Sequence, residues 1–162
     1  MNQLDSGVAR LPGRVGPRPQ TGPMMPHQQL SQNAPQPLQE RLFQRARTLA
    51  GVTVRESRVS VPGARALVLE EGSRGPREAF MVDGEFAHLH PPYDGSLHLI
   101  LPEEAAREVI ERGWGELHPA ARMGMIPATA LMVYGPRDEE ELETVWAILR
   151  ISYEHARGEG NT

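Results

Sequence analysis

The chain has 162 residues and a formal net charge of −4, so its length suits one domain and it lacks the basic excess that follows a phosphate backbone. It contains no cysteine and no lysine, which excludes disulfides, thiolate metal sites and amine catalysis by lysine. A run of about 20 apolar residues and the apolar region of a secretory signal are both missing, so we expect a cytoplasmic protein that binds neither nucleic acid nor membranes.

The first 36 residues are rich in proline, glycine and glutamine and show almost no apolar periodicity. A segment of this kind cannot bury enough apolar surface to offset its chain entropy. We therefore predict a disordered leader over residues 1–36, a single domain over 37–158 and a short tail over 159–162.

Apolar residues at helical spacing between Pro37 and Gly51 predict an amphipathic helix. Alternating valines from residue 52 to 61 and an apolar run over 64–69 flank Pro62-Gly63, which predicts two strands joined by a tight turn. A further strand is expected over 79–90, bent or interrupted at Asp83-Gly84.

Strands are also expected over 96–101 and 129–134, with a helix from Pro102 to Gly113 between them. The last helix has the clearest start, because Asp138 can cap it and Glu141 follows three residues later. Hairpins dominate this order, so the sequence predicts an α+β fold: a mostly antiparallel sheet with helices packed on one face.

The most informative pattern lies in residues 85–101. His88 and His90 are two residues apart, so on a strand their side chains leave the same face. If residues 91–95 form the loop of a hairpin, His98 lies directly across from His88. Three imidazoles would then share one face, and burying them is costly unless they hydrogen-bond, bind an ion or line a pocket. His118 is a candidate fourth member, and Asp94 is a neighbouring carboxylate.

Three interpretations of the cluster stay open. His88, His90 and His98 could hold a divalent metal such as iron, zinc or manganese, because neutral imidazole suits these ions. Without a metal, one histidine could act as a general base while others orient an enolic or phenolic substrate. In the third interpretation, the histidines are structural and satisfied by backbone partners.

Three residues outside the hairpin are further candidates. Arg137 follows a strand and opens a helix, where it could clamp an anionic oxygen or pair with an acidic neighbour such as Glu140. Trp114 could stack on a planar ligand or belong to the core. Tyr134 lies at the end of the expected strand, and it belongs to the same short motif, residues 134–138, as Arg137.

Four motifs, in this order and spacing, resemble the fungal luciferase family, whose domain oxidises 3-hydroxyhispidin in luminous mushrooms. They cover roughly the last half of the chain and lie at residues 85–90, 94–99, 113–119 and 134–140. A looser likeness to cupins rests on His88, His90 and Asp94 and also favours a metal-dependent oxygenase.

The resemblance implies an oxygenase that adds molecular oxygen to an enol-pyrone and uses no organic cofactor. Its shared positions include His88, His90, His98, His118 and Arg137, to which we assign catalysis, and Asp94, Trp114 and Tyr134, to which we assign substrate binding. Arginine as the only strongly basic residue type, and a proline-rich leader in place of a membrane anchor, favour a non-luminous bacterial relative with another small-molecule substrate. The alternative is a non-catalytic domain that binds a metal or metabolite at the same histidines.

Overall fold

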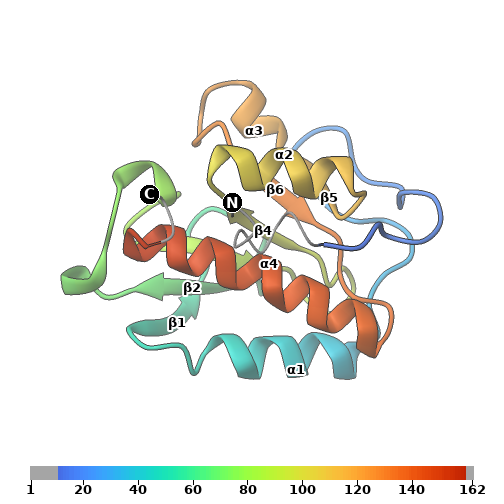
Figure 1. Cartoon of the computed structure of the whole chain (residues 1–162), viewed down its shortest axis with the longest axis horizontal. Coiled ribbons are helices and arrows are strands. Elements are labelled where there is room, and N and C mark those ends of the chain that lie inside the picture. Colours follow the sequence, from blue (N-terminus) through green and yellow to red (C-terminus); the bar gives the residue numbers. More distant parts are fainter. Residues whose placement is uncertain (1–10, 160–162) are drawn as a thin grey trace, which may run out of the picture.

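The structure is a computed structural model that describes residues 11–159. Its centre is a six-stranded antiparallel sheet with the strand order β1-β2-β3-β4-β6-β5, so the predicted sheet type is confirmed (Figure 1). The strands are β1 (Val52–Glu56), β2 (Arg65–Leu69), β3 (Glu85–Leu89), β4 (Leu97–Ile100), β5 (Gly115–Leu117) and β6 (Ala130–Val133).

Three helices cover one face of this sheet: α1 (Gln36–Ala46), α2 (Glu103–Glu111) and α4 (Glu139–Arg157) (Figure 1). Their apolar residues share one core with alternate residues of the strands, among them Leu97, Leu99 and Leu131. A fourth, single-turn helix, α3 (Pro119–Arg122), packs on the opposite face, where Ala121 contacts Ile100 and Ala130. The predicted α+β class is therefore confirmed, with the three longer helices on one face as expected.

The long helix α4 begins as the sequence predicts. The Asp138 carboxylate accepts a hydrogen bond from the Glu141 backbone N–H at 2.9 Å, which satisfies a backbone donor that the helix itself leaves free. Gly158 ends the helix in the left-handed conformation that glycine adopts without strain. This well-defined helix lies across the middle of the sheet, as Figure 1 shows.

The predicted hairpin over 52–69 is present and its turn at Pro62-Gly63 is formed, but this turn does not join the two strands directly. β1 ends at Glu56, and residues 57–64 form a longer loop before β2. The Ser57 hydroxyl donates to the Glu85 carboxylate at 2.7 Å, which draws the start of this loop toward the sheet face opposite α4. Val59 and Val61, expected in a strand, therefore belong to that loop.

The predicted strand over 79–90 is also shorter than expected. Asp83 and Gly84 both have positive φ angles, 44° and 79°, and form a tight turn, with a bridge between Val82 and Glu85, before β3 starts at Glu85. The edge strand β5 and the helix α3 were not anticipated, because each is too short to show a periodic pattern.

Residues 11–35 differ most from expectation, since the composition predicts disorder and the structure packs them against the domain. The Trp114 indole donates to the Pro12 carbonyl at 2.7 Å, and Arg18 donates to the Gly115 carbonyl at 2.8 Å. The Gln29 side chain accepts from the Gly135 N–H at 3.1 Å. Polar contacts with other parts of the chain hold this segment in place. A prediction based on the periodicity of apolar residues cannot detect such contacts.

The 149 residues placed by the structure, 11–159, include no helix that is long and apolar enough to cross a membrane.

Candidate functional site

The hairpin β3–β4 brings its three histidines together in the predicted register. His88 pairs directly with His98 across the two strands, and the His90 N–H donates to the Ser96 carbonyl at 2.9 Å. All three side chains are buried, with residue exposures of 2–3%. Because Leu97 and Leu99 face the α4 core, the intervening His98 must face the other side of the sheet.

Two more histidines from distant segments complete the cluster around His98. The His27 ring stacks on His98 with centroids 5.2 Å apart, and the His118 ring meets its edge at 4.3 Å. His118 is the fourth member that the sequence suggests, whereas His27 was missed because it lies in the segment expected to be disordered. Nothing in the pattern around His27 could have singled it out.

A pocket of about 380 Å³ opens onto this cluster. Three segments meet around it: residues 25–27, the loop after β1, and the histidine face of the sheet. Its lining residues are Met25, Pro26, His27, Val59, Ser60, Val61, His90, His98 and His118. The pocket therefore joins apolar walls to a floor of imidazoles, the composition that small-molecule sites usually have.

Glu85 lies beside His88 because β3 contains a bulge. Ala87 pairs with Leu67, but Glu85 pairs with the next residue of β2, so Phe86 is an extra residue in β3. In a regular strand, residues three apart leave opposite faces; here the extra residue turns the Glu85 carboxylate to within 2.8 Å of the His88 Nδ1. Burial opposes ionisation of Glu85, but its hydrogen bonds with His88 and Ser57 outweigh this and lower its pKa.

Asp94 has the corresponding role for His90. Its fully buried carboxylate accepts from the His90 Nδ1 at 2.9 Å, the Gln29 N–H at 3.1 Å, and both the N–H and hydroxyl of Ser96 at 2.8 and 2.5 Å. Burial disfavours its charge, yet these donors lower its pKa overall. Asp94 therefore supports His90 and does not line the pocket.

A row of hydrogen bonds continues from His88 through the cluster. The His88 Nε2 lies 3.0 Å from the His98 Nδ1, and the His98 Nε2 lies 3.2 Å from the His27 Nδ1. The His27 Nε2 then contacts the Glu116 carboxylate at 2.8 Å. Glu116 also accepts from the Tyr134 hydroxyl at 2.7 Å, so Tyr134 is linked to the histidines through Glu116.

Burial keeps the central rings neutral. It lowers the pKa of His98 well below the ordinary value, and neighbouring histidines lower it further. It also lowers the pKa of His88, although Glu85 opposes this change. At the far end of the row, burial and the Glu116 carboxylate raise the pKa of Tyr134 to about 12, so its hydroxyl stays a hydrogen-bond donor at neutral pH.

His118 is fixed as a donor toward the pocket. It caps α3, and its Nδ1 accepts the Ala120 backbone N–H at 2.9 Å. A backbone N–H can only donate, so in the neutral ring the hydrogen must be on Nε2. Burial lowers the pKa of His118 to about 4, and nearby histidines add to the effect. At neutral pH, His118 thus offers one N–H.

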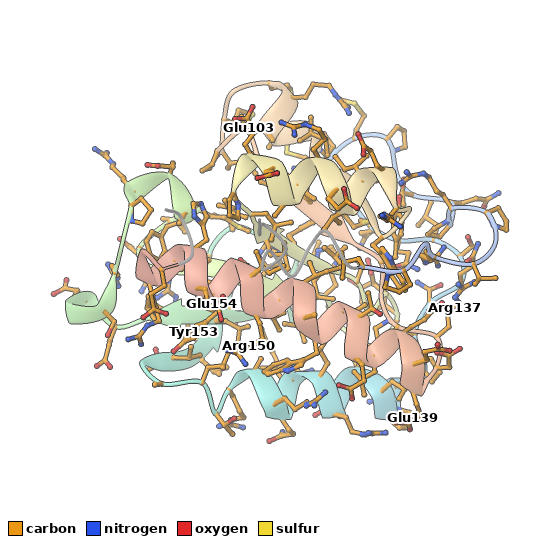
Figure 2. All side chains as sticks on the ribbon, in the orientation of Figure 1. Glu103, Arg137, Glu139, Arg150, Tyr153 and Glu154 are labelled. Atoms are coloured by element: carbon orange, nitrogen blue, oxygen red, sulfur yellow. The ribbon has the colours of Figure 1, made fainter. Side chains whose placement is uncertain are left out.

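Trp114 and Arg137 are not part of the histidine pocket. They line a different pocket of about 510 Å³ that shares no lining residue with it. Arg137, labelled in Figure 2 near the start of α4, donates to both carboxylate oxygens of Glu141. Its acidic partner is thus Glu141, one residue beyond the Glu140 suggested by the sequence. Trp114 is buried in the main core.

The Arg137–Glu141 pair should make stability depend on pH. Burial disfavours the Glu141 carboxylate, but hydrogen bonds from Arg137 lower its pKa in the folded state. A lowered folded pKa contributes stability that is fully present above the unfolded pKa, about 4.3, and is lost as the pH falls through the folded value. Urea unfolding between pH 7 and 3 should therefore show a smaller acid-induced loss for Glu141→Gln than for wild type. Equal losses would contradict this role.

Known proteins match the part of the chain that contains most of the cluster. Residues 83–152 match the family model described as Luciferase domain. Over 70 residues the chain is 41% identical to the luciferases of Armillaria gallica and Armillaria mellea, and 40% identical to that of Neonothopanus nambi. Each match covers 42% of this chain, and the chain spans about a quarter, 26%, of the relatives' length. No solved structure matches the chain.

The matched region runs from the turn before β3 into α4, so it includes His88, His90, His98 and His118. His27 and the loop after β1 lie outside it, although they close the same pocket. Through residues 83–152, the chain is therefore similar to the Luciferase domain family and to the fungal luciferases.

Proposed function

We propose that this protein is an oxygenase-like enzyme that oxidises an enolic or phenolic small molecule with molecular oxygen in the histidine pocket. The observation that carries the proposal is a cluster of five histidines, four of which line a pocket; His88, His90, His98 and His118 lie within the residues that match the Luciferase domain. The relatives' name supports the reaction class, because a luciferase is an enzyme that oxidises a small molecule to produce light.

His118 supplies the donor side of the proposed reaction. An enol must lose its proton before oxygen can attack the electron-rich carbon, and the enolate oxygen then needs a hydrogen-bond donor. The His118 Nε2–H offers that donor at the pocket wall. It keeps the hydrogen at neutral pH because Nδ1 is already occupied by the Ala120 N–H.

The acceptor side comes from His88, His90 and His98. Glu85 and Asp94 accept hydrogen bonds from the Nδ1–H groups of His88 and His90, so each Nε2 carries a lone pair, and that of His88 faces the His98 Nδ1 at 3.0 Å. These lone pairs can accept the proton that the enol releases. Alternatively, they can coordinate a cation whose charge balances the enolate. Asp94 and Tyr134 are positioning residues in this scheme. Arg137 and Trp114 have no part in it because they line another pocket.

A non-catalytic binding domain is the second candidate function. The favouring observation is that two groups of three histidines have ligand nitrogens within 4.8 Å of one another, His88–His90–His98 and His27–His98–His118. Such a domain would bind its metal or metabolite without consuming oxygen.

An oxygen electrode separates the two candidates. The purified full chain would be offered 3-hydroxyhispidin, simpler 3-hydroxy-2-pyrones and catechols, with binding of each compound followed in parallel by calorimetry. The oxygenase should consume oxygen only when a bound compound is present, with a rate that saturates. Saturable binding of a compound without oxygen uptake would instead identify the binding domain.

A further inference from the structure

We infer that His88, His90 and His98 bind one divalent first-row transition metal, with Glu85, Asp94 and His27 orienting the three ligands. One nitrogen from each histidine lies within 4.8 Å of the other two. The His88 Nε2 and His98 Nδ1 are 3.0 Å apart, which is about the separation of two ligands that lie about 2.1 Å from one ion at a right angle. A catalytic role for the metal depends on the proposed oxygenase activity, whereas metal binding itself does not.

The carboxylates around the cluster have the arrangement that supports metal-binding histidines. A ligating imidazole usually donates its other N–H to a carboxylate, which fixes the tautomer and the direction of the ring. His88 has such a partner in Glu85 at 2.8 Å, and His90 has one in Asp94 at 2.9 Å. Both carboxylates are fully buried, so each is committed to its histidine and neighbouring donors.

His98 receives the same support through a relay. With Nδ1 on the metal, its Nε2–H would donate to the His27 Nδ1, now 3.2 Å away. The His27 Nε2–H would then donate to the Glu116 carboxylate at 2.8 Å. His98 is thus oriented by a neutral histidine backed by a carboxylate, so each of the three ligands has a fixed acceptor.

Counting hydrogens favours a cation between His88 and His98. The row from Glu85 through His88, His98 and His27 to Glu116 has four contacts, and each needs one hydrogen. Three neutral imidazoles supply only three, and an ionised carboxylate supplies none. A metal inserted between the His88 Nε2 and the His98 Nδ1 removes one contact. Three hydrogens then serve three contacts, and no additional proton has to be buried.

The other histidine group, His27–His98–His118, suits a metal less well. The His118 Nδ1 accepts the Ala120 N–H, so its Nε2 carries the hydrogen and has no lone pair for a metal. The donor set of three neutral imidazoles therefore points to His88, His90 and His98, and it suits iron, zinc, copper or nickel better than magnesium or calcium.

The test titrates cobalt(II) into the purified, untagged 162-residue chain from which metal has been removed by a chelator. Visible absorption would follow binding, and plasma mass spectrometry would give the stoichiometry. We expect one cobalt per chain, loss of the site in His98→Ala, and an affinity lower by about 10- to 100-fold in Glu85→Gln. His118→Ala, which changes a histidine of the same pocket, is the matched control and should bind cobalt as wild type does.

Thermal unfolding shows whether each variant is folded, so that loss of cobalt binding can be distinguished from failure to fold. Cobalt should raise the melting temperature of wild type and His118→Ala but not of His98→Ala, because a ligand stabilises only a folded state that binds it. No stoichiometric cobalt in folded wild type, or equal weakening by His98→Ala and His118→Ala, would overturn the inference. Stoichiometric cobalt binding without oxygen uptake would support the metal site and count against the proposed oxygenase. Oxygen uptake without any cobalt binding would overturn the metal site and leave the oxygenase intact.

Discussion

Replacing His88 and His98 together by glutamine is expected to lower the rate of oxygen uptake by about 10²- to 10⁴-fold, the range typical of a lost acid–base group. Both rings contact each other at 3.0 Å in the centre of the cluster, and glutamine preserves polarity without the two ring nitrogens. Because the apolar lining residues and His118 are unchanged, binding of the organic compound should persist. An oxygen electrode gives the rate, and calorimetry gives the affinity.

His155→Gln is the control for this double variant. His155 is a buried histidine of α4 outside the cluster, so its replacement tests whether any buried histidine affects turnover. Loss of rate with retained affinity supports an enzyme, and loss of affinity alone supports a binding domain. If the double variant and the control behave like wild type, the histidine pocket is not the functional site.

Asp94→Ala is expected to destabilise the fold by about 3–5 kcal/mol, because it removes the acceptor that several buried donors share. The Asp94 carboxylate accepts four hydrogen bonds, and alanine would leave the donors of His90, Ser96 and Gln29 without it. Each unsatisfied buried donor costs about 1–3 kcal/mol, less whatever water recovers. Urea unfolding at pH 7 measures the difference.

Glu143→Ala provides the comparison for Asp94. Glu143 pairs with Arg45 at 3.1 Å, but its side chain is 60% exposed, so its loss should cost no more than about 1 kcal/mol. If Asp94→Ala were as mild as Glu143→Ala, Asp94 would not hold the hairpin loop and residues 11–35 together.

The hairpin could be predicted from the sequence because strand geometry constrains it strongly. Side chains on a strand alternate with a period of two, so His88 and His90 had to share a face. The few residues between His90 and His98 in the sequence leave room only for a short loop, and a short loop pairs His88 with His98. The α4 start was equally predictable, since an Asp138 cap depends only on nearby residues.

Other parts of the site depend on contacts that no local pattern records. His27 reaches the cluster because residues 11–35 hydrogen-bond to the domain through polar groups. Glu85 reaches His88 only because Phe86 is an extra residue in β3, and neither the bulge nor the long loop after β1 has a periodic signature. Arg137 illustrates the converse, since its motif suggested catalysis and its side chain pairs with Glu141.

The most direct test of the oxygenase account is the fate of isotopically labelled oxygen. Purified protein would turn over a 3-hydroxy-2-pyrone under ¹⁸O₂, and mass spectrometry would follow the label in the organic product and in any carbon dioxide released. The account predicts ¹⁸O in these products with wild type and its loss in the His88/His98 double variant. Product formation without label, or saturable pyrone binding with no product at all, would contradict it.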